Sequence, residues 1–483
     1  MIHYAAVNVN PKQESKTMRL WHTWWMWCAP LRGACARKRT FLWMCVVLIG
    51  FSVRQDLWGV TSMVRALGLT APCYDRILDF FHSSALDVKM LAQLWTARIL
   101  LHHPHLVRFN GKPVLPGDGI KVPKAGKKMP GVKRLHQASE SNTKPTYILG
   151  HSCQAAGILV RGMQSVVCIP LIARIHEGIV FSNRCKRTLL DKMVEMLDSL
   201  ELGEPFYFVA DAYYASKKII VPLLKQGCHL VTRVRSNAVA YLPAPKVNTG
   251  KRGRPTVYGE KVKLNRLFEG EDLMQTISSP VYGETDVQLH IRAINLLWRP
   301  VGILVQFIAV AHPTRGKMIL MSTDLSLTPS QVIELYGYRF KIEVSFKSAL
   351  HVVGAFLYHF WMKDMTPISK KGKDQYMHHK SPDYRDAVRR KRDAYHRFIQ
   401  LGLIAQGIMC VLATTVPELV LGAFGSYFRT IRPGIAPSEA MVAISLQNTL
   451  PNLFTDNFSE PILTKFLREK LDLRQTRAKG LAA

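Results

Sequence analysis

The alternation of strand-like and helix-like runs between residues 112 and 235 constrains the fold of this chain more than any other feature. Short apolar runs bounded by turn residues are typical of strands, and apolar residues spaced three and four apart are typical of helices. Strand-like runs cover 112–122, 155–161, 166–175, 205–210 and 229–235, and helical patterns cover 186–200 and 216–227. This order predicts an α/β fold in which a mixed sheet packs against helices.

The flanking regions have different patterns. Residues 1 to about 17 are polar and are predicted to be disordered. A helical pattern covers 20–105, and an apolar helical segment covers 398–416 after a basic, polar stretch. Between 236 and 327 the alternation is interrupted by three further strand-like runs, at 287–298, 301–311 and 317–324.

The net charge indicates an anionic partner. The chain has 65 Lys and Arg residues against 34 Asp and Glu residues, which gives a formal net charge of +31 at pH 7. Such a field attracts phosphate backbones or anionic lipid. Nucleic acid is favoured because the charge is spread through a long folded chain and is not confined to one amphipathic segment or tail.

No segment is predicted to cross a membrane. The apolar run 41–53 would form a helix about 20 Å long, shorter than the roughly 30 Å hydrocarbon core of a bilayer, so it is predicted to be a buried core helix. It also lies far from the start of the sequence and lacks an obvious signal-peptide cleavage site. The nine cysteines include no CxxC pair, which predicts free thiols in a reducing cytosol.

A helix-turn-helix outline is present at 59–82, "GVTSMVRALGLTAPCYDRILDFFH". The pattern predicts a helix, a turn at Gly68, and a second helix capped by Thr70 with Pro72 in its first turn. Tyr74 and Arg76 would lie near the end of this second helix that could enter a DNA groove. A plain helical hairpin fits equally well, and it would bury four apolar residues, Leu67, Ile77, Leu78 and Phe81.

Two aspartates stand out by their positions. Asp118 lies between two glycines in a strand-like run, and seven Lys and Arg residues surround it within 112–134. Asp211 directly follows the buried strand-like run 205–210. A surface salt bridge, worth roughly 0–1 kcal/mol, is the simplest role for Asp118. The alternative is that Asp118 holds a metal ion where a polyanion binds.

A third acid, Glu343, lies on a predicted helix with a mixed face. The helix is expected to begin with Thr328 as N-cap, Pro329 in the first position and Gln331 completing a capping box. One face carries residues spaced three, four and seven apart, namely Tyr336, Arg339, Glu343, Phe346, Lys347 and Leu350. Aromatic, cationic and acidic residues do not form a simple core stripe, although a solvated helix with an Arg339–Glu343 ion pair would explain this segment alone.

Together, the three acids and their surroundings resemble the DDE transposases of bacterial insertion sequences. The motifs are "GDGIKVPKAGKKMPGVK" around the first acid, "FVADAYYASK" around the second and "YGYRFKIEVSF" around the third. The resemblance covers roughly 112–361 and is closest to the group whose last motif is Tyr, two residues, Arg, three residues, Glu, six residues, Lys. It implies a ribonuclease H-like sheet with Asp118, Asp211 and Glu343 as metal-binding acids. By the same resemblance, Tyr336 and Arg339 would act beside them on the DNA end.

One position departs from the motif of this group. The Lys expected seven residues after Glu343 is Leu350, and the nearest cation on that face is Lys347. Either Lys347 takes the place of the missing Lys or that contact to DNA is lost.

The chemistry implied by the resemblance explains why acids lie among basic residues. Breaking a phosphodiester requires an activated water or 3′-hydroxyl and stabilisation of the charge on the leaving oxygen. Two Mg²⁺ ions about 3.5–4 Å apart, which Mn²⁺ can replace, supply both effects and take carboxylate ligands. Candidate contacts to the DNA backbone are Lys121, Lys124, Lys127 and Lys128, and a solvated loop is the alternative for each.

The resemblance also implies a mostly β insertion between Asp211 and Glu343, in agreement with the strand-like runs there. Its segment "GKRGRPTVYG" has Arg252 and Arg254 beside Gly and Pro, as in a hook that places arginine in a narrow A·T minor groove. A basic linker is an equal alternative. Trp298 could stack on an unpaired base near the cleaved end, but core packing is the favoured role.

These observations predict a DDE transposase that binds the terminal inverted repeats of its own element and target DNA. Pairing of two ends implies at least a homodimer on DNA, and a bacterial cytoplasmic, nucleoid-associated location is expected. The expected parts are a helical DNA-binding region (1–110), the first part of the catalytic domain (111–235), a β-rich insertion (236–327), the Glu-bearing helix (328–361), and a basic loop with a helical C-terminal part (362–483). The alternatives are a non-catalytic DNA-binding repressor, which Leu350 favours, and a metal-dependent nuclease without strand transfer.

Overall fold

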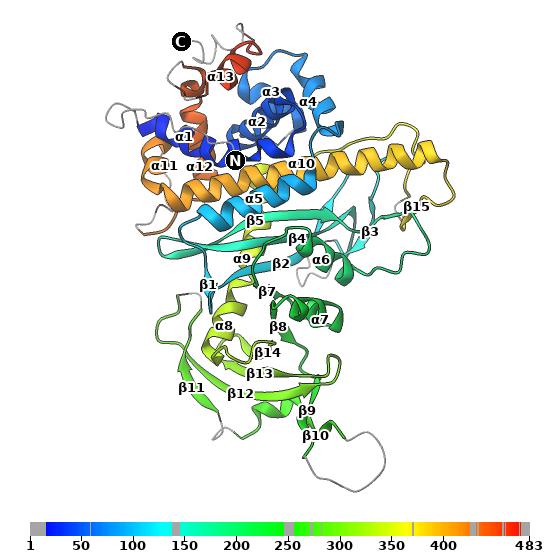
Figure 1. Ribbon diagram of the computed structural model, residues 1–483, viewed down its shortest axis with the longest axis vertical. Coiled ribbons are helices and arrows are strands. Elements are labelled where there is room, and N and C mark those ends of the chain that lie inside the picture. Colours follow the sequence, from blue (N-terminus) through cyan, green and yellow to red (C-terminus); the bar gives the residue numbers. More distant parts are fainter. Residues whose placement is uncertain are drawn as a thin grey trace.

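A large sheet runs along most of the molecule, and helices gather at one end of it (Figure 1). The computed structural model describes residues 16–57, 59–137, 145–245, 256–270, 274–281, 283–369, 371–425, 431, 434–455, 458, 460–472 and 474. The disorder predicted for residues 1 to about 17 falls almost wholly outside these residues. The first helix begins at Lys16.

The centre of the sheet has a ribonuclease H-like strand order. Five strands follow one another as β5 (Ser165–Ile175), β4 (Tyr147–Gly162), β2 (Lys112–Pro123), β7 (Tyr207–Ala210) and β8 (His229–Val234). β4 is antiparallel to both β2 and β5, whereas β7 is parallel to both β2 and β8. Helix α6 (Leu189–Asp198) precedes β7, and α7 (Lys217–Lys225) connects β7 to β8. This arrangement confirms the predicted fold class.

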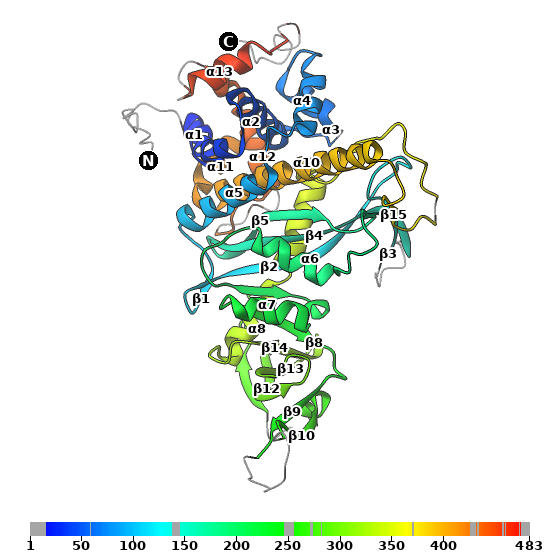
Figure 2. The same ribbon diagram turned by 45° about the vertical axis from the view of Figure 1, so that its right-hand side comes forward.

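The strands between 236 and 327 extend this sheet. They are β9 (Val239–Pro243), β10 (Tyr258–Lys263), β11 (Gln275–Ser278), β12 (Gln288–Trp298), β13 (Ile303–His312) and β14 (Gly316–Ser322). β14 pairs antiparallel with β8, and β13 and β12 follow it outward. Figure 2 shows these strands at the end of the molecule opposite the terminal helices. Four short strands complete the pairing. β1 (Arg108–Phe109) pairs with β2, and β3 (Lys133–His136) pairs with β4. β6 (Ile179–Val180) and β15 (Gln375–Tyr376) pair with each other.

Helices from the two ends of the chain share one core. They are α1 (Lys16–Cys28), α2 (Lys38–Val53), α3 (Gly59–Leu67), α4 (Cys73–His82) and α5 (Val88–His102), with α10 (Pro382–Thr415), α11 (Pro417–Phe424), α12 (Glu439–Asn448) and α13 (Pro461–Arg468). Trp21 donates from Nε1 to the backbone oxygen of Thr449 at 3.0 Å. α10 lies across β5, where Gln400 donates to the backbone oxygen of Leu171 at 2.7 Å. The predicted parts 1–110 and 362–483 are therefore in contact with each other and with the sheet.

The long apolar helices lie in this core. Every residue of the run 41–53 is buried within α2, as predicted. In the described part of the chain, α10 is the helix long and apolar enough to cross a membrane, and 94% of its apolar window is buried inside the protein. Packing against α2 and β5 accounts for its apolar residues. The nine cysteines are free thiols, as predicted.

Helices α3 and α4 form the predicted pair, with one correction at the start of α4. Gly68 ends α3 in the left-handed conformation (φ +64°), and Tyr74 and Arg76 are exposed on α4. Thr70 is not the N-cap, because the Cys73 N–H donates to the Thr70 backbone oxygen at 3.0 Å in a turn and α4 begins only at Cys73. The opposite face of the pair is buried, at Leu67, Ile77, Phe80 and Phe81.

Glycine allows the close approach of α10 to its neighbours. A Cβ added at Gly407 would lie 2.3 Å from the indole of Trp95. That indole is fully buried and donates to the backbone oxygen of Pro170 at 3.0 Å, so it cannot easily move. In contrast, nothing lies within 4 Å of the corresponding position at Gly422 in α11.

We expect Gly407→Ala to lower the free energy of unfolding, because overpacking against a fixed ring costs about 1–3 kcal/mol and outweighs the gain in helix propensity. Gly422→Ala is the matched control, and it should raise the free energy of unfolding by about 0.5–1 kcal/mol through helix propensity alone. Urea denaturation followed by circular dichroism measures both. Equal shifts in the two variants would contradict the packing of α10 against Trp95.

Candidate active site

Asp118 and Asp211 lie side by side at the centre of the sheet. β2 and β7 are parallel neighbours in which Val114–Pro116 pairs with Tyr207–Val209. Continuing this register by two residues places Asp118 beside Asp211. Asp211 directly follows β7, as predicted, because all four residues of that short strand are buried and the chain first reaches a more open position after it.

The glycines around Asp118 have distinct local roles. A Cβ at Gly117 would lie 2.4 Å from the ring of Phe208 in β7, so only glycine lets the two strands pack at this point. The backbone N–H of Gly119 donates to Oδ1 of Asp118 at 2.7 Å. The carboxylate of Asp118 is thereby oriented by its own strand.

Asp211 is anchored by the turn that follows β7. Its Oδ1 accepts a hydrogen bond from the backbone N–H of Tyr213 at 3.0 Å. Its backbone oxygen accepts from the hydroxyl of Thr232, a fully buried residue of β8, at 2.7 Å. The position of Asp211 is thus fixed from both its side chain and its backbone.

The helix that carries Glu343 begins as predicted but is interrupted. α8 (Pro329–Tyr338) has the predicted capping box, in which Thr328 and Gln331 exchange side-chain to backbone hydrogen bonds. The regular α-helical hydrogen bonding then stops at Arg339 and resumes in α9 (Lys341–Ser348), although the backbone of Arg339 and Phe340 stays in the right-handed α region. Hydrogen bonds follow a three-residue spacing at this interruption, with the Glu343 N–H donating to the Phe340 oxygen at 3.0 Å. The prediction of one continuous helix is therefore corrected to two.

Arg339 joins the first and third acids. Its Nη1 lies 3.1 Å from Oδ2 of Asp118, and its Nη2 lies 2.5 Å from Oε1 of Glu343. The side chains of Arg339 and Asp118 are only 19% and 20% exposed, whereas that of Glu343 is 41% exposed. The ion pair expected for a solvated helix is therefore present, but Arg339 also reaches the strand that carries Asp118.

The surroundings of Asp118 raise the pKa of its carboxyl group to about 6. Burial is the largest cause, and the charges of Asp211 and Glu343 act in the same direction, against the lowering effects of the Gly119 N–H and Arg339. Burial lowers the pKa of Arg339, but its pairing with Glu343 and Asp118 outweighs this, so the net shift is upward. A partly buried acid with like charges beside it is the arrangement expected of a functional site.

The donor set suits a hard divalent cation, because two carboxylates come from neighbouring strands and the third is linked to the first of them through Arg339. Among the described residues, however, no three His, Cys, Asp or Glu side chains converge closely enough to hold one ion. Arg339 lies between Asp118 and Glu343 instead. The donor type of the three acids, Asp118, Asp211 and Glu343, fits a metal ion. For all three to bind the same ions, Arg339 would have to break its ion pair with Asp118 or with Glu343.

The predicted backbone-binding lysines separate into two kinds. Lys121 and Lys127 are exposed, with Lys121 donating to the backbone oxygen of His136 at 2.6 Å. Lys124 is buried, and its ammonium donates to the backbone oxygens of Phe356 and Tyr358. The prediction that Lys124 contacts DNA is therefore corrected, because its ammonium is hydrogen-bonded to the segment that follows the Glu343 helix.

The two cation positions after Glu343 also differ. Lys347 is exposed one turn beyond Glu343 on α9. Leu350 lies in a π-helical turn, Ala349–Val353, and its partly buried side chain packs against the core. Tyr336 is partly buried on α8, where it influences the pKa of Arg339.

Of the predicted DNA contacts of the insertion, Trp298 is the one that lies within the described residues. Arg252 and Arg254 lie outside the described residues. Trp298 is buried at the end of β12, opposite Ile303 of β13. Its burial favours the core-packing role over stacking on an unpaired base.

Sequence reasoning missed a buried polar link that ends beside the aspartates. Gln154 of β4 is only 3% exposed and donates to the hydroxyl of Tyr214 at 3.0 Å. Its oxygen lies 2.6 Å from Nδ1 of His176, just after β5. The available signals were a lone Gln directly before the strand-like run 155–161 and the paired tyrosines after Asp211.

A family model for DDE superfamily endonucleases matches residues 34–296, which is more than half of the chain. The chain belongs to this superfamily. The match includes Asp118 and Asp211 and ends before Glu343. Endonucleases of this superfamily generally use divalent metal ions.

Other comparisons add little to this assignment. No curated protein matches the chain. A cryo-EM structure of the piggyBac transposase synaptic complex with hairpin DNA is similar at 12% identity, covering 96% of this chain and 86% of that chain. Its TM-score is 0.33.

Lys124→Ala should lower the free energy of unfolding, because each buried carbonyl left unpaired costs about 1–3 kcal/mol. The matched control is Lys127→Ala, an exposed lysine three residues later, whose effect should stay within about 0.5 kcal/mol. Thermal or urea denaturation checks both. Equal stability of the two variants would return Lys124 to the candidate DNA contacts.

Proposed function

We propose that this DDE superfamily member is a transposase. It binds the terminal inverted repeats of its own element, cleaves them with divalent metal ions to expose 3′-hydroxyls, and joins these to target DNA. The observation that carries the proposal is the placement of Asp118 beside Asp211, with Glu343 linked to Asp118 through Arg339. The family match and the net charge of +31 support it.

Asp118, Asp211 and Glu343 are the proposed ligands of the metal ions, Mg²⁺ or Mn²⁺. When bound, such ions supply charge stabilisation and an activated nucleophile for phosphodiester cleavage. The turn after β7 and the N–H of Gly119 hold the two aspartates in fixed orientations, which is the protein's own contribution to alignment. Pre-oriented carboxylates lose little freedom when a cation or substrate arrives.

Arg339 has two proposed roles that depend on what is bound. Without other cations it balances the charges of Asp118 and Glu343. Once those acids bind metal, its guanidinium becomes free for the phosphates of the DNA end, where a bidentate contact suits its geometry. Tyr336 lies one turn before Arg339 on α8 and Lys347 lies one turn after Glu343 on α9. Both are proposed to contact the same DNA end.

The DNA sequence is proposed to be recognised by the helical layer. Tyr74 and Arg76 are exposed on α4, and Arg76 lies with Arg37 and Arg39 around a pocket between α2 and α4. Pairing of two element ends implies at least a dimer on DNA. A non-catalytic DNA-binding repressor is the second candidate, and Leu350 in place of a motif Lys favours it. A metal-dependent nuclease without strand transfer is the third.

The acids are tested by Asp118→Asn, Asp211→Asn and Glu343→Gln, which remove charge with little change in shape. Cleavage of labelled terminal DNA with Mg²⁺ should fall by orders of magnitude in each, and combining the changes should add little because the residues act as one unit. DNA binding should survive, since negative charge facing phosphate is removed. Glu418→Gln, an exposed acid of α11, is the control. A Glu343→Gln protein that cleaves at the parental rate would sink the assignment, and cleavage without joining would favour the nuclease.

Recognition by α4 is tested with point variants, because α1–α5 share a core with α10 and their deletion would disrupt it. Arg76→Ala should weaken binding to terminal DNA, by about 1–3 kcal/mol if it contacts a base, and reduce the preference over unrelated DNA. Lys225→Ala, which removes one exposed charge at the end of α7, should leave the preference unchanged. Competition binding at fixed salt measures the ratio of the affinity for terminal DNA to the affinity for unrelated DNA. An unchanged ratio for Arg76→Ala would move recognition to another surface.

A further inference from the structure

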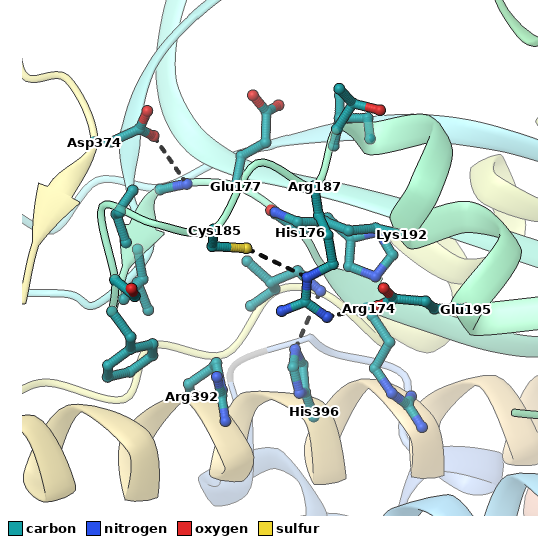
Figure 3. Close-up of a pocket in the computed structure, with 18 residues that line it drawn as sticks. Arg174, His176, Glu177, Cys185, Arg187, Lys192, Glu195, Asp374, Arg392 and His396 are labelled. Atoms are coloured by element: carbon teal, nitrogen blue, oxygen red, sulfur yellow. Dashed lines mark hydrogen bonds and ion pairs between the residues drawn. The ribbon is translucent and has the colours of Figure 1, made fainter. Parts of the chain in front are cut away.

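A pocket of 580 Å³ opens where β5 ends (Figure 3). Its walls come from the end of β5, the loop leading to α6, α6 itself, the residue just before β15, and the side of α10. Figure 3 shows the guanidinium of Arg187 near the middle of this space, with His396 and Arg392 below it on α10.

Positive charge exceeds negative charge in this pocket. Four cations line it, namely Arg174, Arg187, Lys192 and Arg392. The acids that line it are Glu177, Glu195 and Asp374, and each is already paired. Lys133 lies 3.1 Å from Glu177 and 3.0 Å from Asp374, and Arg187 lies 2.8 Å from Glu195.

Two of the cations have only neutral hydrogen-bond acceptors. Lys192 donates to the backbone oxygen of His176. Arg174 donates to Oε1 of Gln400 at 2.8 Å and to the backbone oxygen of Ala173 at 2.8 Å. Burial lowers the pKa of Arg174 to about 10, which still leaves it charged at neutral pH. The pocket thus contains positive charge that can attract an anion.

The remaining lining is suited to an organic phosphate more than to a bare ion. Burial lowers the pKa of His176 to about 3 and that of His396 in the same direction, so both rings are neutral. Phe181 forms part of the wall, with the guanidinium carbons of Arg389 and Arg392 at 4.8 and 5.3 Å from its ring centre. A ligand here meets cationic, neutral polar and aromatic surfaces together.

The pocket lies on the same edge of the sheet as the acids. β2, β5 and β7 run in one direction, so their carboxyl ends share an edge. Burial is the main cause that raises the pKa of Tyr213, and the charges of Glu177 in the pocket and Asp211 in the acid site add to it, so both acids lie near this tyrosine. The buried link from His176 through Gln154 to Tyr214 joins the two sites.

We propose that this pocket binds a backbone phosphate of the DNA strand whose end enters the acid site. This inference rests on the proposed function, because it assigns the pocket to the same DNA. Lys192 and Arg187 would pair with the phosphate, and the neighbouring sugar and base would face Phe181. The contact would fix the position of the strand relative to Asp118 and Asp211.

The test neutralises one phosphate at a time. Terminal duplexes with a single methylphosphonate at successive positions are bound to full-length wild-type, Lys192→Gln and Lys225→Gln proteins without metal. A methylphosphonate at one or two positions should weaken binding by the wild type and by Lys225→Gln, and should weaken binding by Lys192→Gln much less, because only Arg187 remains to pair with that phosphate. The slope of log K against log salt should become shallower by about 0.7–0.9 in Lys192→Gln alone. Lys192→Arg should restore both effects, and Arg187→Gln should repeat the loss if Lys192→Gln fails to fold.

Other outcomes overturn the proposal. Additive losses at every position, or equal slopes for Lys192→Gln and Lys225→Gln, would show that the pocket touches no DNA phosphate. Saturable stabilisation of wild-type protein by a free deoxynucleoside monophosphate or inorganic phosphate, with no methylphosphonate effect, would assign the pocket to a small molecule. Binding is measured without cleavage, so failure here leaves the acid-variant test of the transposase untouched.

Discussion

The parallel pairing of β2 with β7 is the constraint on which the rest of the structure depends. It places two aspartates side by side, and it can form only because Gly117 leaves room for Phe208. A parallel strand buried on both faces must be covered by helices on both, and Figures 1 and 2 show α6 and α7 in front of the sheet with α9 passing behind it. α9 therefore has two roles, because it covers the rear face of the sheet and also places Glu343 near the aspartates.

This geometry concentrates like charges in a chain whose overall charge is strongly positive. Three carboxylates near one another would repel, and burial of Asp118 adds a desolvation cost, which is why its pKa rises to about 6. Arg339 offsets the repulsion from within the same helical segment. The protein can thus fold with its acids near one another before any other cation is present. Arg339 must then break one or both of its ion pairs before the acids can bind metal together.

Local sequence signals predicted the elements of the site well, because they depend on neighbouring residues. The capping box at Thr328 and the burial of β7 before Asp211 are such cases. Features that depend on distant segments were missed. In the sequence, Lys124 is one of several basic residues in a loop. Its ammonium nevertheless donates to the backbone oxygens of Phe356 and Tyr358, which are more than 200 positions away. The shared core of the terminal helices and the cationic pocket after β5 are non-local in the same way.

The departure at Leu350 also has a non-local explanation. After Ser348 the helix widens into a π-helical turn that ends at Gly354, where φ is +70°. Arg54, at the end of α2 and only 2% exposed, donates to the backbone oxygen of Val353 at 2.5 Å and secures this end. Position 350 therefore turns toward the core, where a lysine would lose its hydration, while Lys347 stays exposed beside Glu343. Through Arg54, the helical layer proposed to read DNA is joined directly to the end of the segment that carries the third acid.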